Sequence, residues 1–250
     1  MSTKSFEIWF VTGSQNLYGD ETLRQVASQS QLVVDQLAKG LSANVKVVWQ
    51  PVVKTNEEIR ATLMAATASE ACVGVITWMH TFSPAKMWIN GLELLKKPLL
   101  HLHTQAGQSL PWATIDMDFM NLNQAAHGDR EYAHILSRMD VARKVVVGHP
   151  TDQRVQSEVD AWAYATLGWQ KSQHLKLARF GDNMRYVAVT DGDKVSAQMT
   201  FGMSIEQLGV NTLVDAVAKV SEADAEKLCM EYEQLYDVAA ELRQGGARRD

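Results

Sequence analysis

Two histidines two positions apart on a strand-like segment could bind a metal ion. His101 and His103 would project from one face of that strand, because alternate side chains of a strand point to the same side. Asp116 and Asp118 form an acidic pair further along the chain. Imidazole and carboxylate ligands suit Mn²⁺ or Mg²⁺ better than an ion that prefers thiolates. The pattern has a second interpretation, in which the histidines only pack and hydrogen-bond and Asp116-Met117-Asp118 begins a helix.

A second group of polar residues follows the strand-like segments, in loops rich in amide, hydroxyl and imidazole groups. These loops are 14–19, 80–83, 103–105, 149–152 and, if a sixth strand joins the sheet, 181–185. Neutral donors and acceptors beside aromatic or thioether groups suit a sugar, whose hydroxyls form hydrogen bonds and whose C–H face packs on apolar side chains. Polar loops of this kind can also serve only to cap helices. Composition alone therefore leaves both interpretations open.

Several common catalytic motifs are missing. The loop after Gly13 lacks G-x-G-x-x-G, and the chain has neither a phosphate-binding G-x-x-x-x-G-K-[ST] nor a G-x-S-x-G elbow. Cys72 and Cys229 lie far apart and outside any C-x-x-C pattern, so we expect reduced packing residues. These absences disfavour nicotinamide enzymes, ATP enzymes and hydrolases of the α/β type.

The composition is that of an ordinary globular protein. The chain has 250 residues, of which 46% are hydrophobic and 21% charged, and its net charge is −5. This charge offers no basic surface for nucleic acid or an anionic membrane. No segment approaches the roughly 18 apolar residues of a membrane span, and residues 1–4 lead into a strand without a signal sequence. We therefore expect a cytoplasmic protein that binds neither nucleic acid nor membranes.

The elements that must position these groups follow an alternating pattern. Strand-like segments cover 6–13, 45–53, 72–79, 98–103 and 144–148, and helical patterns cover 21–41, 55–69, 84–96, 118–139 and 152–170. Alternation of this kind, with strands apolar on both faces, predicts a doubly wound parallel sheet in an α/β domain over residues 1–173. Ligands of such sheets bind beyond the carboxyl ends of the strands.

A second, smaller α/β lobe is expected over residues 174–250. A strand at 175–180 is followed by Asp191-Gly192-Asp193, which predicts a β-hairpin between 186–188 and 194–201. Two helices close the lobe, and Ser221 has the position of a cap for the second. The polar tail 244–250 carries no apolar pattern.

Four blocks of sequence resemble L-arabinose isomerases. They are Trp9-Phe10-Val11-Thr12-Gly13-Ser14-Gln15-Asn16-Leu17-Tyr18-Gly19, His80-Thr81-Phe82-Ser83-Pro84-Ala85-Lys86-Met87-Trp88-Ile89-Asn90-Gly91, Asp116-Met117-Asp118-Phe119-Met120-Asn121-Leu122-Asn123-Gln124 and Arg179-Phe180-Gly181-Asp182-Asn183-Met184-Arg185. The resemblance runs from about residue 6 to about residue 236, and it covers only the first half of the family pattern.

The resemblance implies the Rossmann-like fold of the fucose and arabinose isomerase group and a role in carbohydrate metabolism, in arabinose catabolism. Such enzymes interconvert L-arabinose and L-ribulose, often also D-galactose and D-tagatose, and use a divalent ion, usually Mn²⁺. Their two metal-binding glutamates and two histidines lie in the second half, so the catalytic and metal-binding residues have no matched positions here. His101 departs from the amide that the family more often has there.

Seven substrate-binding residues carry over by position: Gln15, Leu17, Tyr18, Phe82, Gln124, His127 and Met184. By the resemblance, the first three form a sugar-contacting loop, Phe82 an aromatic wall and Met184 a floor. Gln124 and His127 are residues that the homo-oligomers of the family present to a neighbouring subunit's pocket.

Three functions follow as hypotheses. The first is an unusually short isomerase, active as a homo-oligomer, with replacement metal ligands drawn from His80, His101, His103, Asp116, Asp118, His127 and Asp182. The second is a non-catalytic remnant that binds sugar or takes part in assembly and lacks the family metal centre. The third is a fragment of a longer enzyme.

Overall fold

A computed structural model describes residues 5–239 of the chain. The chain divides into two compact units, residues 1–171 (unit 1) and 172–250 (unit 2). Sequence analysis expected the change of character at residue 174.

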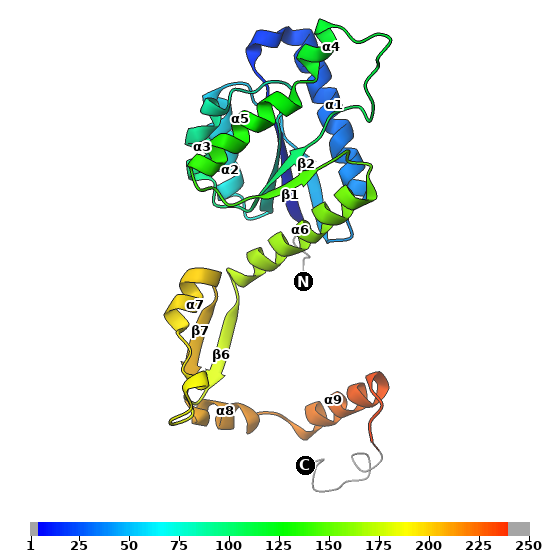
Figure 1. Ribbon diagram of the computed structural model, residues 1–250. Helices are drawn as coiled ribbons and strands as arrows, with labels where there is room; N and C mark the ends of the chain where they lie inside the picture. Colours follow the sequence, from blue (N-terminus) through cyan, green and yellow to red (C-terminus); the bar gives the residue numbers. More distant parts are fainter. Residues whose placement is uncertain (1–4, 240–250) are drawn as a thin grey trace. The chain divides into compact units, whose positions relative to one another are not determined.

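Unit 1 is built on a five-stranded parallel sheet (Figure 1). Its strands are β1 (Phe6–Thr12), β2 (Val45–Trp49), β3 (Cys72–Trp78), β4 (Leu99–His103) and β5 (Lys144–Val147). Their order is β2-β1-β3-β4-β5, and each neighbouring pair is parallel. The chain steps outward from β1 to β2 and then crosses to β3, so the order reverses between β1 and β3. The predicted doubly wound α/β fold is confirmed.

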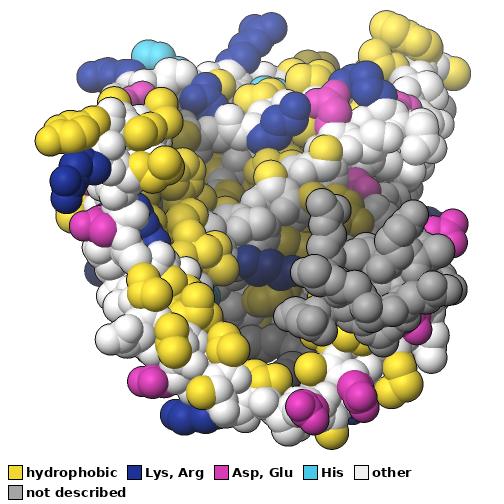
Figure 2. Space-filling view, turned by 90° about the horizontal axis from the view of Figure 1, so that it is seen from below, with side chains coloured by type: hydrophobic (Ala, Val, Ile, Leu, Met, Phe, Trp, Pro, Cys, Tyr) yellow, Lys and Arg dark blue, Asp and Glu magenta, His cyan; other side chains and the backbone are white. Residues whose placement is uncertain are grey.

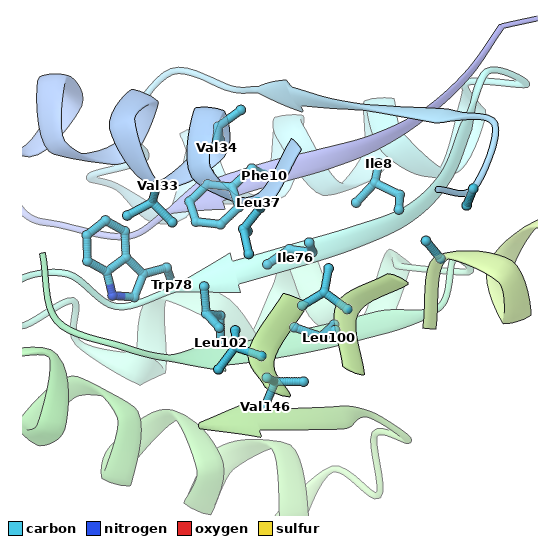
Figure 3. Packing of buried hydrophobic residues seen from close by; sticks show 14 of the residues in the cluster. Ile8, Phe10, Val33, Val34, Leu37, Ile76, Trp78, Leu100, Leu102 and Val146 are labelled. Atoms are coloured by element: carbon cyan, nitrogen blue, oxygen red, sulfur yellow. The ribbon is translucent and has the colours of Figure 1, made fainter. Parts of the chain in front are cut away.

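Helices cover both faces of this sheet. One face carries α1 (Gly19–Lys39) and α6 (Gln153–Ser172), and the other carries α2 (Asn56–Ala68), α3 (Ile89–Leu94) and α5 (Ala125–Arg138) (Figure 1). Figure 3 shows the hydrophobic core on the face covered by α1 and α6. There, Val33 and Leu37 of α1 pack over strand residues such as Phe10 and Trp78. Because β3 is buried along its whole length, the middle of the sheet is a rigid platform for the loops at its end.

Two of the expected helices differ in their details. The 118–139 pattern is split into α4 (Met117–Leu122) and α5, with a break at Asn123 and Gln124. The 84–96 pattern begins as a 3₁₀ turn, η2 (Ala85–Trp88), before α3. Ser83 does not cap this turn, because its hydroxyl accepts a hydrogen bond from the Trp88 indole N–H at 3.0 Å.

Unit 2 contains a separate two-stranded sheet. In it, β6 (Lys176–Phe180) pairs in parallel with β7 (Ser204–Leu208). The elements around them are η3 (Ala188–Thr190), α7 (Lys194–Phe201), α8 (Val210–Val217) and α9 (Glu222–Leu235). The predicted tail 244–250 lies outside the described residues.

The predicted hairpin in unit 2 is wrong. Asp193 accepts a hydrogen bond from the Ser196 backbone N–H at 2.8 Å and caps α7, so residues 194–201 form a helix and not a returning strand. Aspartate is favoured both in tight turns and at helix N-caps. Here Asp193 is the N-cap of α7, which is the crossover helix of a parallel β-α-β unit. The sixth strand therefore belongs to this small sheet and does not extend the main one.

Burial differs sharply between the units. Of the residues that the structure describes, none after Leu167 is buried. Figure 2 shows many hydrophobic side chains exposed at the surface, with charged side chains among them. Within residues 5–239, no helix is both long and apolar enough to cross a bilayer.

Candidate functional site

The loops that follow β1 and β3 lie side by side where the strand order reverses. The hydroxyl groups of Ser14 and Thr81 hydrogen-bond each other at 2.7 Å in a buried position. The Gln15 amide donates to the Phe82 carbonyl at 3.0 Å, and the Phe82 backbone N–H donates to the Tyr18 hydroxyl at 3.2 Å. Because a reversal of strand order separates the outgoing connections, it opens a crevice at the carboxyl ends of the two strands. These hydrogen bonds hold the rim of that crevice in one conformation.

Helix α5 brings His127 to the same rim. The imidazole of His127 meets the Phe82 ring edge to face, with centroids 4.6 Å apart. Gln124 lies at the break between α4 and α5, where its amide donates to the Asn121 side-chain carbonyl at 3.2 Å. The structure therefore brings Gln15, Tyr18 and His127 each into contact with Phe82.

A pocket of about 640 Å³ opens beside this rim, between the start of α1 and helix α4. Leu17, 83% exposed, and Tyr18 contribute to its wall. The other lining residues are Glu21, Thr22, Gln25, Asp118, Phe119, Asn121 and Leu122. Hydroxyl, amide and carboxylate groups beside an aromatic ring suit a small polyhydroxylated molecule, and the volume is in the range of ligand sites.

Sequence reasoning did not find the lining residues Thr22, Gln25 and Asn121. Thr22 and Gln25 lie one turn apart near the start of α1, and that spacing indicates a shared helix face without indicating what the face meets. Only the return of α4 over α1 shows that this face lines a pocket.

Met184 belongs to unit 2. Its side chain is exposed, and its backbone N–H donates a hydrogen bond to the Thr190 hydroxyl oxygen at 3.0 Å. Asp182, a candidate metal ligand, lies in the same loop. It accepts the Asn183 backbone N–H at 2.8 Å, which lowers the pKa of its carboxyl group.

His80 is buried at the end of β3. Its ring stacks on the Trp78 indole with centroids 4.2 Å apart, its Nε2 hydrogen-bonds the Gln29 side-chain oxygen, and its Nδ1 has no hydrogen-bond partner. Burial lowers the pKa of His80 to about 4, so the ring is neutral at physiological pH. His80 is therefore a neutral packing residue, and its Nδ1 atom makes no hydrogen bond.

Within the described residues, His101, His103 and Asp129 form the one group of three side chains suited to a metal ion. His101 Nε2 lies 2.7 Å from one Asp129 oxygen and His103 Nδ1 lies 3.1 Å from the other. Burial lowers the pKa of His101, and the hydrogen bond with Asp129 opposes that effect. Two of the seven proposed ligands are thus brought together, by a carboxylate that sequence reasoning missed.

Two other proposed ligands, Asp116 and Asp118, lie outside this group. Asp116 accepts the Phe119 backbone N–H at 2.8 Å and caps α4, which confirms the helix-start interpretation of Asp116-Met117-Asp118. Asp118 lines the pocket beside α1. Asp129 faces the histidines because α5 crosses β4, and no local pattern around Asp129 carries that information.

The fold and the site together define a class: a doubly wound α/β protein with a polyol-sized pocket at the reversal of its strand order. Residues 2–174 match the family model of the L-arabinose isomerase N-terminal domain, and residues 176–250 match that of the central domain. The chain belongs to the L-arabinose isomerase family.

Curated relatives are similar over the whole chain. The L-arabinose isomerase of Clavibacter sepedonicus is 55% identical over 249 residues, covering 100% of this chain and 49% of that protein. Those of Nocardioides sp. and Geobacillus stearothermophilus are 58% and 54% identical, covering 98% and 100% of this chain and 49% and 50% of theirs. The chain spans about half the length of these relatives.

Proposed function

We propose that this chain acts in the interconversion of L-arabinose and L-ribulose and supplies the sugar-binding surface for it. The observation that carries the proposal is the set of hydrogen bonds that joins Gln15, Tyr18 and Phe82 beside a polar pocket. Family membership and relatives named L-arabinose isomerase support the same function. The expected cytoplasmic location is part of this proposal.

The proposed role of the described residues is binding and orientation. An extended pentose offers hydroxyl groups along its length, and amide and hydroxyl side chains such as Gln25, Asn121 and Thr22 can pair with them. The Phe82 ring, held against His127, offers an apolar surface for the C–H face. D-Galactose shares the configuration of L-arabinose at C2 to C4, so we propose D-galactose as a second substrate.

Metal dependence is proposed from the family resemblance. The isomerisation moves a hydrogen between C1 and C2, and a divalent ion such as Mn²⁺ supplies charge stabilisation to an enediol. The described residues do not fit the family's centre of two glutamates and two histidines, because the pocket carboxylates Glu21 and Asp118 have no histidine beside them. We therefore assign no catalytic base and no ligand of that centre to the residues of this pocket.

We also propose that the protein works as a homo-oligomer with its pockets at subunit interfaces. His127 is exposed on unit 1, and Gln124 lies at the nearby helix break, so both could face a neighbouring copy. Large apolar side chains exposed near the pocket, such as Leu17 and Met120, support an interface in this region.

The test compares sugar binding and turnover by the full chain and its variants. We expect saturation-transfer NMR to detect L-arabinose, and Gln15→Ala and His127→Ala to weaken its binding about tenfold, the effect of losing one net hydrogen bond of about 1.4 kcal/mol. His134→Ala is the matched control, because His134 is exposed on the same helix two turns away. Ketose formation should require added Mn²⁺.

Two outcomes would contradict the proposal. If wild type, Gln15→Ala and His127→Ala bound the sugar equally well and circular dichroism showed intact folds, these residues would not contribute to sugar binding. L-Arabinose binding without turnover at any Mn²⁺ concentration would favour the non-catalytic sugar-binding function.

A further inference from the structure

His101, His103 and Asp129 form a compact group at the carboxyl end of β4. The two histidines point from the same face of the strand, and α5 places the Asp129 carboxylate between them. The three potential ligand atoms lie within 4.8 Å of one another. The group is separate from the two loops that follow β1 and β3, and none of its members lines the pocket beside α1.

The surroundings of His101 favour one tautomer. Its Nδ1 lies 3.0 Å from the Thr77 hydroxyl oxygen, and that hydroxyl donates its own proton to the Leu100 carbonyl at 3.5 Å. The Thr77 oxygen is therefore an acceptor for Nδ1–H. In neutral His101 the Nε2 lone pair then faces an Asp129 oxygen at 2.7 Å. In that tautomer a proton or a metal ion must lie between the two acceptors.

Asp129 also lacks the usual compensation for a buried charge. The residue is 3% exposed, and among the described residues it has no ion pair with Lys or Arg. Both carboxylate oxygens face imidazole nitrogens instead. A carboxylate removed from water is stable only with a positive partner, so this site is suited to hold one.

A cavity of about 470 Å³ gives access to the group. It is lined by His103, Gln105, Gln108, Asp129, Arg130 and His149, among others. The His103 side chain is 25% exposed, and the Gln105 side-chain oxygen is buried without a hydrogen-bond partner. An unused acceptor in the wall can receive a hydrogen bond from a water bound to an ion in this cavity.

We propose that His101 Nε2, His103 Nδ1 and one Asp129 oxygen bind a single late first-row divalent ion, with Zn²⁺ and Co²⁺ preferred to Mn²⁺. Two imidazoles and one carboxylate are a ligand set typical of four-coordinate Zn²⁺, whereas Mn²⁺ prefers sites richer in oxygen. The fourth position faces the cavity and holds water. Thr77 is a positioning residue, because its hydrogen bond directs Nε2 toward the ion.

The test is a titration of the metal-free full chain with Co²⁺. We expect one equivalent to bind and to give the visible absorption of a tetrahedral complex, and Zn²⁺ to displace it. Asp129→Asn should weaken Co²⁺ binding at least about a hundredfold, and Thr77→Val about tenfold, in line with the usual effect of orienting partners on metal affinity. His134→Gln, on the same helix and exposed, should leave the affinity unchanged.

The same experiment can overturn the proposal. Absence of a tetrahedral Co²⁺ spectrum would show that a shared proton, and not a metal ion, separates His101 from Asp129. Equal affinity in wild type and Asp129→Asn would place any bound ion elsewhere. Should the buried Asp129→Asn variant fail to fold, His103→Gln decides between these outcomes, because His103 is partly exposed and its replacement creates no cavity in the core.

Discussion

At the scale of single residues, the histidines of this chain differ in burial and in neighbouring groups, and therefore in the interactions that they can make. His80 is buried against Trp78 and neutral, His101 is buried against Asp129, and His127 is exposed on the Phe82 ring. The sequence alone does not separate these three residues: His80 follows an apolar segment, His101 lies within one, and His127 lies near the start of a helix. Their surroundings in the fold decide which can carry a proton, face a cation or contact a ligand.

Burial of His80 predicts a loss of stability in mild acid. Its pKa is lowered from 6.5 to about 4 in the folded protein, so the unfolded chain binds the proton first as the pH falls. The free energy of unfolding should therefore fall by about 2 kcal/mol between pH 7 and pH 5 from this residue, with little further loss below about pH 4. Urea unfolding at both pH values measures it.

Variants separate the contribution of His80 to the pH dependence of the free energy of unfolding from that of other residues. His80→Gln should remove that part of the pH dependence and leave the part due to His101, whose lowered pKa acts in the same direction. Exposed His134→Gln should keep the wild-type pH dependence. If the free energy of unfolding of His80→Gln depended on pH in the same way as that of the wild type, His80 would not be the group responsible for the loss of stability in acid.

At the scale of elements, close packing of α5 against the residues that follow β3 brings His127 and Asp129 to their places. Gly128 lies between them, where an added Cβ would be 2.9 Å from the Met79 Cβ and 3.2 Å from the Thr81 carbonyl oxygen. A side chain at Gly128 would push α5 away from the strand and disturb both groups of residues at once.

Two helical glycines provide a matched comparison. Gly128→Ala should destabilise the protein by about 1–3 kcal/mol through overpacking. Gly168→Ala on α6, where an added Cβ meets nothing within 4 Å, should instead stabilise it by up to about 1 kcal/mol, because alanine is the better helix former. Urea denaturation of both variants measures the difference, and equal stabilities would mean that α5 does not pack this closely.

At the scale of the whole molecule, exposed apolar side chains are informative about assembly. In unit 1, Leu17 of η1 (Asn16–Tyr18), Trp112 of the segment before α4 and Met117 at the start of α4 are 83%, 78% and 65% exposed. Large apolar groups gathered on a surface are typical of contacts with another protein. The proposed homo-oligomer would cover them.

This predicts that replacement of Trp112 weakens self-association. Trp112→Ser should raise the dissociation constant about thirtyfold, corresponding to the roughly 2 kcal/mol of an interface hot spot, and sedimentation velocity should show a shift to smaller species. Leu32→Ser, at an exposed position on α1, is the control and should not change the assembly. A wild-type chain that stays monomeric at all concentrations would contradict the prediction.

Much of the fold follows from local patterns in the sequence. The five strands of unit 1 were placed from their apolar segments, and Ser221 caps α9 as its position predicts. The hairpin at Asp191-Gly192-Asp193 was predicted by the same kind of reasoning and was wrong, because aspartate serves turns and helix caps equally well. Local patterns thus identify elements better than they identify connections.

By itself, the sequence determined the alternation of strands and helices, the parallel fold class and the set of polar loops after the strands, since each of these depends on residues close together in the chain. Only the tertiary structure decided that β1 and β3 are neighbours, that α4 returns over α1, and that Asp129 reaches His101 and His103. Those contacts join residues far apart in the chain. They depend on strand order and on the rotation of each helix about its axis, which packing of the whole domain sets.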